Sequence, residues 1–252
     1  HGVTYWHHPS WTERGLRHGF LGRTLDARAE NTRWRSIFGA ELRLLKQVHG
    51  TSVCRAETSG EATLQKVQPS VTEADAWIIG QGMPETSYGI LTADCVPVLL
   101  ASSDFRYTAA LHCGWRGTVG DLLPLMVGLL RDAGADPQQL QVLIGPAARG
   151  CCYEIGPEVA AEVLEAEERA LEKNIPTQPG AVLRRTDDNR ILCDISALVR
   201  LQALSSGVPS RSIEHLPFCT ICDERFFSYR REKHQAGRQV SFLGPTMHAN
   251  LP

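Results

Sequence analysis

Three side chains of this sequence could share one metal ion: His49, Cys95 and His112. A catalytic zinc site usually takes three protein ligands from histidine, cysteine or a carboxylate and leaves one position open. The three residues lie far apart along the chain, so their spacing alone does not bring them together. A lone histidine or cysteine is more often part of the core than a ligand.

Two short apolar runs would have to position Cys95 and His112. Residues 96–101 and 107–111 are joined by a polar turn at 102–104, which is typical of two neighbouring strands. Cys95 precedes the first strand and His112 follows the second. The pattern therefore predicts that both side chains lie at the same end of one sheet.

His49 lies in the segment 46–56, KQVHGTSVCRA, which predicts a strand, a tight turn at Gly50 and a second strand. Further strands are predicted at 75–80, 140–144, 213–217, 226–229 and 240–243, with a turn at 80–87. Helical spacing of apolar residues predicts helices at 30–45, 121–133, 157–173 and 194–206. The strand at 107–111, the helix at 121–133 and the strand at 140–144 predict a βαβ crossover.

Length and composition limit the class of protein. The 252 residues are 42% hydrophobic and 21% charged, which is enough apolar material for a substantial core. With no repeat or linker, we expect one domain over residues 1–252, of the α+β (mixed α/β) class, with a mixed sheet flanked by helices. The formal charge of −2 gives no electrostatic reason to expect a nucleic acid or an anionic membrane as partner. No apolar run is long enough to span a membrane, and no signal peptide opens the chain.

Eight cysteines raise the question of disulfides. A chain of this length does not need them, and the adjacent pair Cys151-Cys152 is awkward for a bridge. We therefore expect reduced thiols and a cytoplasmic protein. The CxxC motif Cys219–Cys222 would need two more ligands to hold a second metal. The candidates near it in sequence are His215 and Cys193, and buried thiols are the favoured interpretation.

Five blocks of the sequence together resemble one protein family. They are KQVHG (46–50), LTADCVPVLL (91–100), HCGWRGT (112–118), IGPAARGCCYEIG (144–156) and CTICDERFFSYRREKHQAGRQVSFLG (219–244). In this order they are similar to the YfiH/YlmD-type laccase-domain, or polyphenol oxidase, family, whose members are also described as multi-activity purine nucleoside phosphorylases. The resemblance spans nearly the whole chain, and its TADC and H-x-G-W-R-G blocks are specific when they occur together.

The resemblance implies a zinc ion held by His49, Cys95 and His112, the matching positions of QVHG, TADC and HCGWRG. It implies a mixed α/β sandwich with the site in a groove on its sheet. It also implies two reactions: phosphorolysis of adenosine, inosine, guanosine or methylthioadenosine, and deamination of adenosine by water activated on the metal. The expected partners are thus a purine nucleoside and phosphate, and the oligomeric state is open.

Phosphate would need cationic or backbone N–H contacts, and the candidates are Arg23, Arg149, Arg230 and Arg231. Arg230 has more weight because it lies inside the matching FFSYRR block. Gln47 is a candidate for contact with the base or ribose. Asp94 is more readily explained as a residue that hydrogen-bonds near the metal ligands than as one that touches substrate.

The sequence departs from the family pattern in one region. Family members carry a Gly-rich segment and an Asn-containing turn after the His18-Gly19-Phe20 block. Here Arg23 is followed almost directly by 30–33, so a loop after about residue 23 is expected to be missing. Because long loops are often binding lids, this affects the expected substrate contacts and not the metal ligands.

Three alternatives stay open from the sequence. The first is a copper-dependent polyphenol oxidase (laccase-like), although the chain has nine histidines and no H-x-H pair. The second is a metal-free thiol hydrolase with Cys95 as nucleophile and His112 as base. The third is a zinc-stabilised binding module without catalytic activity.

Overall fold

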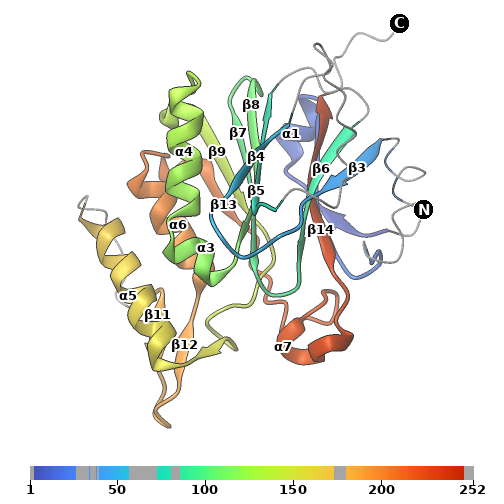
Figure 1. Ribbon diagram of the computed structural model, residues 1–252. Helices are drawn as coiled ribbons and strands as arrows, with labels where there is room; N and C mark the ends of the chain where they lie inside the picture. Colours follow the sequence, from blue (N-terminus) through green and yellow to red (C-terminus); the bar gives the residue numbers. More distant parts are fainter. Residues whose placement is uncertain are drawn as a thin grey trace, which may run out of the picture.

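Two β-sheets and a layer of helices make up the computed structural model, which describes residues 3–26, 34, 38, 40–56, 73–80, 86–172 and 180–246. Figure 1 shows the helices α3 to α6 on one side of the first sheet and the second sheet on its other side. The fold is mixed α/β, as the sequence predicts. None of the described helices is both long and apolar enough to cross a membrane.

The first sheet has six strands in the order β13-β9-β7-β8-β5-β4. They are β4 (Val53–Arg55), β5 (Ala76–Gly80), β7 (Val96–Ser102), β8 (Tyr107–Cys113), β9 (Leu140–Ile144) and β13 (Ile213–His215). Strands β7 and β8 are neighbours, as predicted, and pair antiparallel, with Pro97 opposite His112 and Val96 opposite Cys113. Both strands are buried along almost their whole length, which explains their continuous apolar sequence.

The crossover from β8 to β9 places helix α4 (Leu122–Asp132) on one face of this sheet. Strand β9 is antiparallel to β7, and β7 is antiparallel to β8, so β8 and β9 run parallel with β7 between them. The predicted βαβ unit is therefore present, with one strand inserted. Helix α6 (Ile195–Ser205) packs against α4, and helix α5 (Pro157–Leu171) packs against α6; all three helices agree with the predicted ones.

The second sheet has five strands in the order β1-β2-β14-β6-β3. They are β1 (Tyr5–Trp6), β2 (Leu16–Leu21), β3 (Glu41–Leu44), β6 (Thr86–Thr92) and β14 (Gln239–Thr246). Strand β14, predicted at 240–243, lies in the middle and pairs with both β2 and β6. A small third sheet joins β10 (Glu154–Ile155), β12 (Ile191–Cys193) and β11 (Leu183–Arg185).

Two buried clusters hold these layers together. One lies between the six-stranded sheet and the helices and includes Val98, Leu100, Leu111 and Met126. The other lies between the two sheets and includes Leu99, Ile90 and Trp77. Alternate residues of β7 thus enter different cores, as the period of two along a strand requires.

Four predicted segments differ from the structure. The predicted helix 30–45 ends as strand β3 over Glu41–Leu44, where exposed and buried residues alternate; most of 30–40 lies outside the described residues. Of the predicted turn 80–87, residues 81–85 lie outside the described residues and the last two belong to β6, whose seven residues were not predicted as a strand. Of 46–50, only Lys46 takes part in a β-bridge, to Glu73.

The fourth difference concerns 226–229, which is not a strand. Phe226 and Phe227 are buried, but the chain bends there and enters the short helix α7 (Tyr229–Glu232) with Ser228 as N-cap. The side chain of Gln239 bonds to both the backbone N–H and the carbonyl of Phe227. A side chain therefore replaces the strand partner that the apolar sequence predicts.

Candidate metal centre and cavity

The side chains of His49, Cys95 and His112 meet at one end of the six-stranded sheet. Their potential ligand atoms all lie within 4.8 Å of one another. Cys95 directly precedes β7 and His112 lies near the end of β8, and the strand register brings these two ends together. The rings of His49 and His112 are perpendicular, with centroids 4.8 Å apart. The structure thus brings together the three residues that the sequence singled out.

Asp75, which was not predicted as a site residue, holds both histidines. Its fully buried carboxylate accepts a hydrogen bond from His112 Nδ1 at 2.8 Å. It also accepts the backbone N–H groups of His49 at 2.9 Å, Gly50 at 2.7 Å and Val48 at 3.3 Å. With Nδ1 of His112 donating to Asp75, Nε2 is the nitrogen left for a metal, which is the usual arrangement of a carboxylate, a histidine and zinc.

The backbone adopts left-handed conformations at two non-glycine residues here. His49 has φ of 62° and Asp94 has φ of 95°. Such conformations are uncommon for residues with a Cβ and persist where the surroundings enforce them. Three contacts hold Asp94: its carboxylate accepts Thr220 Oγ1 at 2.7 Å and the Arg230 N–H at 2.6 Å, and its carbonyl accepts the Ala148 N–H at 2.9 Å. Asp94 therefore shapes the turn that presents Cys95.

Glycines of the HCGWRG block allow helix α3 (Trp115–Val119) to pack against the cluster. A Cβ on Gly114 would lie 3.3 Å from the sulfur of Cys95 and 3.3 Å from Cδ2 of His49. A Cβ on Gly117 would lie 2.8 Å from the carbonyl oxygen of Gly50. Larger residues at these positions would displace the turn that carries His49.

Cys95 and His112 shift each other's ionisation. Burial disfavours the Cys95 thiolate, but His112 and His49 outweigh it and lower the Cys95 pKa to about 6. Burial likewise disfavours imidazolium at His112, but Cys95 and Asp75 outweigh it and raise the pKa of His112 to about 9. Without a metal, the pair is therefore a thiolate and an imidazolium near neutral pH.

The donor set suits a divalent ion of borderline softness. Zinc bonds of about 2.0–2.3 Å place ligand atoms roughly 3–4 Å apart, close to the spacing in this cluster. Two imidazoles and one thiolate leave one position of a tetrahedron open, as in catalytic zinc sites. The buried carboxylate of Asp75 supplies the hydrogen bond that orients a ligand. The residues present therefore fit a zinc ion.

A cavity of about 570 Å³ opens beside the cluster. His49, Cys95 and His112 line it, and so do two of the predicted substrate-binding residues, Gln47 and Arg230. The amide of Gln47 forms two hydrogen bonds with the backbone of Leu91, so it ties the His49 segment to β6. The other lining residues are Leu45, Leu91, Thr92, Ala93, Asp94, Trp115, Arg116, Tyr153, Tyr229 and Arg238.

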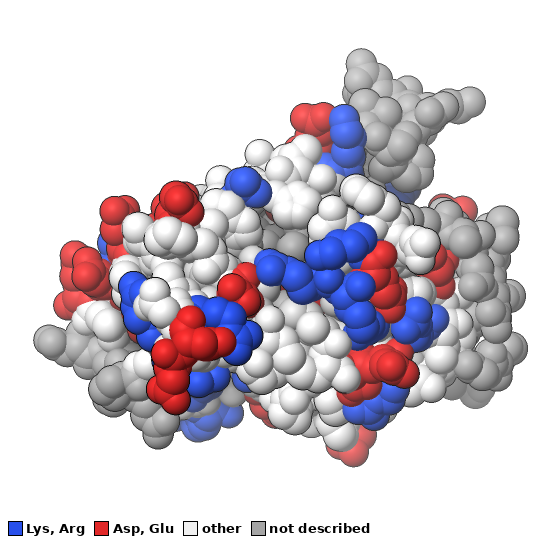
Figure 2. Space-filling model, turned by 90° about the horizontal axis from the view of Figure 1, so that it is seen from below, with Lys and Arg blue, Asp and Glu red and all other residues white. Residues whose placement is uncertain are grey.

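The cationic side chains of the cavity come from three segments. Arg116 stacks on Trp115, with its guanidinium carbon 4.3 Å from the ring centroid. Arg230 lies over the ring of Tyr153 at 5.0 Å and donates to the Glu154 carbonyl at 3.0 Å. Figure 2 shows Lys and Arg side chains gathered near the centre of one face of the molecule. Arg230 was predicted from the sequence but Arg116 was not, although its place in the HCGWRGT block was an available signal.

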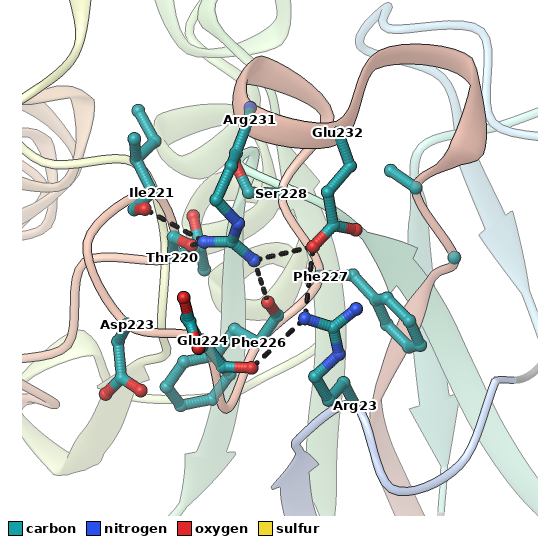
Figure 3. A network of polar contacts seen from close by, with 12 residues as sticks. Arg23, Thr220, Ile221, Asp223, Glu224, Phe226, Phe227, Ser228, Arg231 and Glu232 are labelled. Atoms are coloured by element: carbon teal, nitrogen blue, oxygen red, sulfur yellow. Dashed lines mark hydrogen bonds and ion pairs between the residues drawn. The ribbon is translucent and has the colours of Figure 1, made fainter.

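The other predicted arginines lie elsewhere. Arg23 pairs with Glu232 at 3.1 Å, and Arg149 pairs with Asp194 at 2.8 Å beside a second cavity. Arg231 donates to the carbonyls of Thr220, Ile221 and Phe226, as Figure 3 shows. None of these three arginines lines the cavity beside the cluster. Arg231 instead organises the loop between Cys219 and α7.

The chain is similar to a known family and to named proteins. The family model described as "Multi-copper polyphenol oxidoreductase laccase" matches residues 24–246. The "Purine nucleoside phosphorylase" of Xylella fastidiosa (strain 9a5c) is 35% identical over 195 residues, which are 77% of this chain and 68% of that protein. The "Adenosine deaminase RL5" of an unknown prokaryotic organism is 31% identical over 179 residues, 71% of this chain and 62% of that protein.

A solved structure has the same fold. The crystal structure of Bacillus licheniformis hypothetical protein YfiH superposes with a TM-score of 0.78 over 94% of each chain, at 21% sequence identity. At that identity the likeness concerns the fold alone. It agrees with the arrangement of two sheets and a helical layer described above.

Proposed function

Because this chain belongs to the multi-copper polyphenol oxidoreductase laccase family, matched over residues 24–246, we propose that it is a zinc-dependent enzyme that cleaves and deaminates purine nucleosides. The relatives named purine nucleoside phosphorylase and adenosine deaminase support the choice of substrate. The observation that carries the proposal is the His49–Cys95–His112 group at the wall of a cavity, with Asp75 behind it.

Zinc suits the site better than the copper of the family's description. In the described part of the chain, the groups able to hold a metal are His49–Cys95–His112 and a set of four cysteines. Multicopper oxidase chemistry needs several histidine-rich copper sites, and neither group supplies one. A bound zinc ion would supply Lewis acidity, which polarises an oxygen and lowers the pKa of water.

The size and lining of the cavity suit a nucleoside. Its volume of about 570 Å³ lies within the usual range for small-molecule sites. Trp115, Tyr153 and Tyr229 offer aromatic surface to a purine ring, and the arginines offer charge to an anion. We assign the base and ribose to the aromatic side chains and phosphate to Arg116 and Arg230.

The two reactions make different demands on these residues. In phosphorolysis a phosphate oxygen bonds to C1′ of the ribose, the bond from C1′ to the base breaks, and the base leaves with that electron pair. Arg116 and Arg230 would hold the phosphate dianion beside C1′. In deamination, water adds at C6 of adenosine and ammonia leaves, which requires the purine edge to face the His49–Cys95–His112 cluster.

A product screen tests the proposal. Adenosine, inosine, guanosine and methylthioadenosine are incubated with the zinc-loaded protein, with and without phosphate, and the products are separated by chromatography. We expect free bases only with phosphate, and inosine from adenosine without it. His112→Ala should abolish both, whereas His7→Ala, which changes an exposed histidine, should abolish neither. Full activity in His112→Ala would refute the proposed site.

The phosphate assignment has its own test. Arg116→Ala should raise the KM for phosphate in phosphorolysis and leave phosphate-independent deamination nearly unchanged. Arg131→Ala is the matched control, because Arg131 is an exposed arginine on α4 that pairs with Asp132. An equal loss of both activities in Arg116→Ala would assign Arg116 to nucleoside binding instead.

A thiol hydrolase is the second candidate, because Cys95 and His112 form a thiolate–imidazolium pair without metal. Alkylation distinguishes the two. If zinc protects Cys95 from iodoacetamide and the protected protein is active, the metal enzyme is supported. If the metal-depleted protein is active and alkylation of Cys95 abolishes that activity, the thiol enzyme is supported.

A further inference from the structure

Four cysteines from two distant segments converge outside the cavity described above. Cys151 and Cys152 follow β9, and Cys219 and Cys222 precede α7. Their sulfur atoms all lie within 4.8 Å of one another. The sulfur of Cys222 is 3.6 Å from that of Cys151 and 2.7 Å from that of Cys152. Cys193 and His215 were the partners of the CxxC motif suggested by the sequence, and the structure places Cys151 and Cys152 there instead.

We propose that Cys151, Cys152, Cys219 and Cys222 form a second metal site, a tetrathiolate that holds one zinc ion for structural purposes. Four thiolates in a tetrahedron are the usual donor set of structural zinc, with all four positions taken by protein. With zinc–sulfur bonds of about 2.3 Å, neighbouring sulfurs lie about 3.8 Å apart, which is within the spread of this cluster.

Hydrogen bonds hold the loop between Cys219 and Cys222 in a tight turn. The fully buried Thr220, which follows Cys219, donates its hydroxyl to the Asp94 carboxylate at 2.7 Å. The Asp223 N–H also donates to the Cys219 carbonyl at 2.9 Å, which closes the turn.

The remaining structure already holds the two segments together. Ala147 and Cys219 form a parallel β-bridge, and the Thr220 N–H donates to the Ala147 carbonyl at 3.0 Å. Arg231 donates to the carbonyls of Thr220 and Ile221 inside the motif (Figure 3). Backbone contacts between protein residues therefore hold the two cysteine segments together, and zinc binding requires the Cys152 and Cys222 sulfurs to move apart from 2.7 Å to about 3.8 Å.

The proposed site adjoins the catalytic cavity through Asp94. Thr220, inside the CxxC motif, donates to the Asp94 carboxylate, and Ala148, three residues before Cys151, donates to the Asp94 carbonyl. Asp94 in turn positions Cys95. A metal that holds the two cysteine segments would therefore stabilise the turn that presents Cys95, without itself touching substrate.

Metal content and thiol protection test the proposal. Reduced protein is loaded with excess zinc, desalted and analysed for metal, and its cysteines are alkylated and mapped by mass spectrometry. We expect about two zinc ions per wild-type chain and about one in Cys222→Ser. Cys54→Ser, which changes a cysteine outside both groups, should match wild type. Zinc should protect Cys151 and Cys222, which are otherwise exposed, and a chelator should remove that protection.

A measurement on unmodified protein complements the variant. Cadmium-113 NMR of the cadmium-loaded chain should give two resonances, one of them at the strongly deshielded position typical of four thiolate ligands. Equal alkylation of Cys151 and Cys222 with and without zinc would overturn the proposal. The proposal would also be overturned if Cys152 and Cys222 form a disulfide and the protein, after reduction of that disulfide, binds no more zinc than Cys222→Ser does.

Discussion

Replacing Asp75 by asparagine should weaken both the fold and metal binding. One carboxylate oxygen accepts His112 Nδ1 and the His49 N–H, and the other accepts the N–H groups of Gly50 and Val48. Asparagine has nearly the same shape, but one of its two positions is an NH₂ group. Whichever way the amide is oriented, two N–H donors then face another donor and lose their acceptor.

The magnitude follows from those two lost bonds. A hydrogen bond to a charged group contributes about 1.5–3 kcal/mol, so the free energy of unfolding should fall by roughly 3–6 kcal/mol at most. Loss of the partner that orients a metal-ligating histidine typically costs about 10–100-fold in metal affinity. Both effects should appear in the same variant because one carboxylate holds both histidines.

Urea unfolding and zinc competition with a chromophoric chelator measure the two effects. The control is Asp104→Asn, in which the same change is made at a surface turn where Asp104 accepts Ser102 and Arg106. We expect that control to bind zinc like wild type. If Asp75→Asn also binds zinc with wild-type affinity, Asp75 does not orient the metal ligands and the assignment is refuted.

Three further predictions follow from the structure. Gly114→Ala should reduce zinc affinity, measured by zinc competition, because the new Cβ would crowd Cys95 and His49. The control Gly128→Ala in α4 meets no atom within 4 Å and should stabilise the helix by about 0.5–1 kcal/mol in urea unfolding. Zinc affinity should rise about tenfold per pH unit between about pH 7 and 9, because Cys95, with a pKa of about 6, has then lost its proton and His112, with a pKa of about 9, must give one up. Calorimetry in buffers of different ionisation enthalpy counts that proton, and a flat profile would contradict the pairing. Leu99→Ala, fully buried between the sheets, should lower the free energy of unfolding by about 2–5 kcal/mol in urea, whereas Leu125→Ala, at a residue 43% exposed, should lower it far less.

The pH dependence of the metal-free fold should be weak over the same range. The lowered pKa of Cys95 favours the folded state as pH rises through about 6. The raised pKa of His112 favours it as pH falls, and that contribution is lost as pH rises through about 9. The two contributions have opposite slopes between these values. A strong pH dependence of metal affinity therefore cannot be attributed to unfolding of the metal-free protein.

The sequence predicted the elements whose periodicity is local. Strands β7 and β8 and helix α4 have continuous or amphipathic apolar patterns that need no knowledge of distant contacts. Strand β6 was missed because its sequence, TSYGILT, mixes polar residues and glycine and is stabilised by β3 and β14 from elsewhere in the chain. Residues 226–229 were wrongly predicted as a strand because two consecutive phenylalanines are typical of a buried strand. In the structure the side-chain amide of Gln239, and not a neighbouring strand, bonds to the N–H and the carbonyl of Phe227.

The candidate site was predicted unevenly for a similar reason. His49, Cys95 and His112 were found through their chemical types and the family blocks, and the register of β7 and β8 agrees with the shared sheet end expected for Cys95 and His112. The role of Asp75 could not be predicted, because the sequence around an aspartate before a strand does not show which donors it contacts. In the structure its carboxylate accepts hydrogen bonds from three backbone N–H groups and one imidazole. Arg23 and Arg149 were predicted for their charge alone. Each pairs with a carboxylate far away in the sequence, and these ion pairs, which the sequence does not reveal, hold the two arginines away from the cavity.

Asp75 and Asp94 hold different parts of the site in place. Asp75 holds the two histidines from behind, and Asp94 holds the turn before the cysteine from the side of the CxxC loop. Each is a charged group that accepts backbone N–H donors, and both His49 and Asp94 adopt strained backbone conformations. The three side chains of this cluster come from separate segments of the chain, so contacts outside the cluster have to bring these segments together. The buried carboxylate of Asp75 and the CxxC loop that holds Asp94 supply those contacts, so the fold itself keeps the three side chains close to one another.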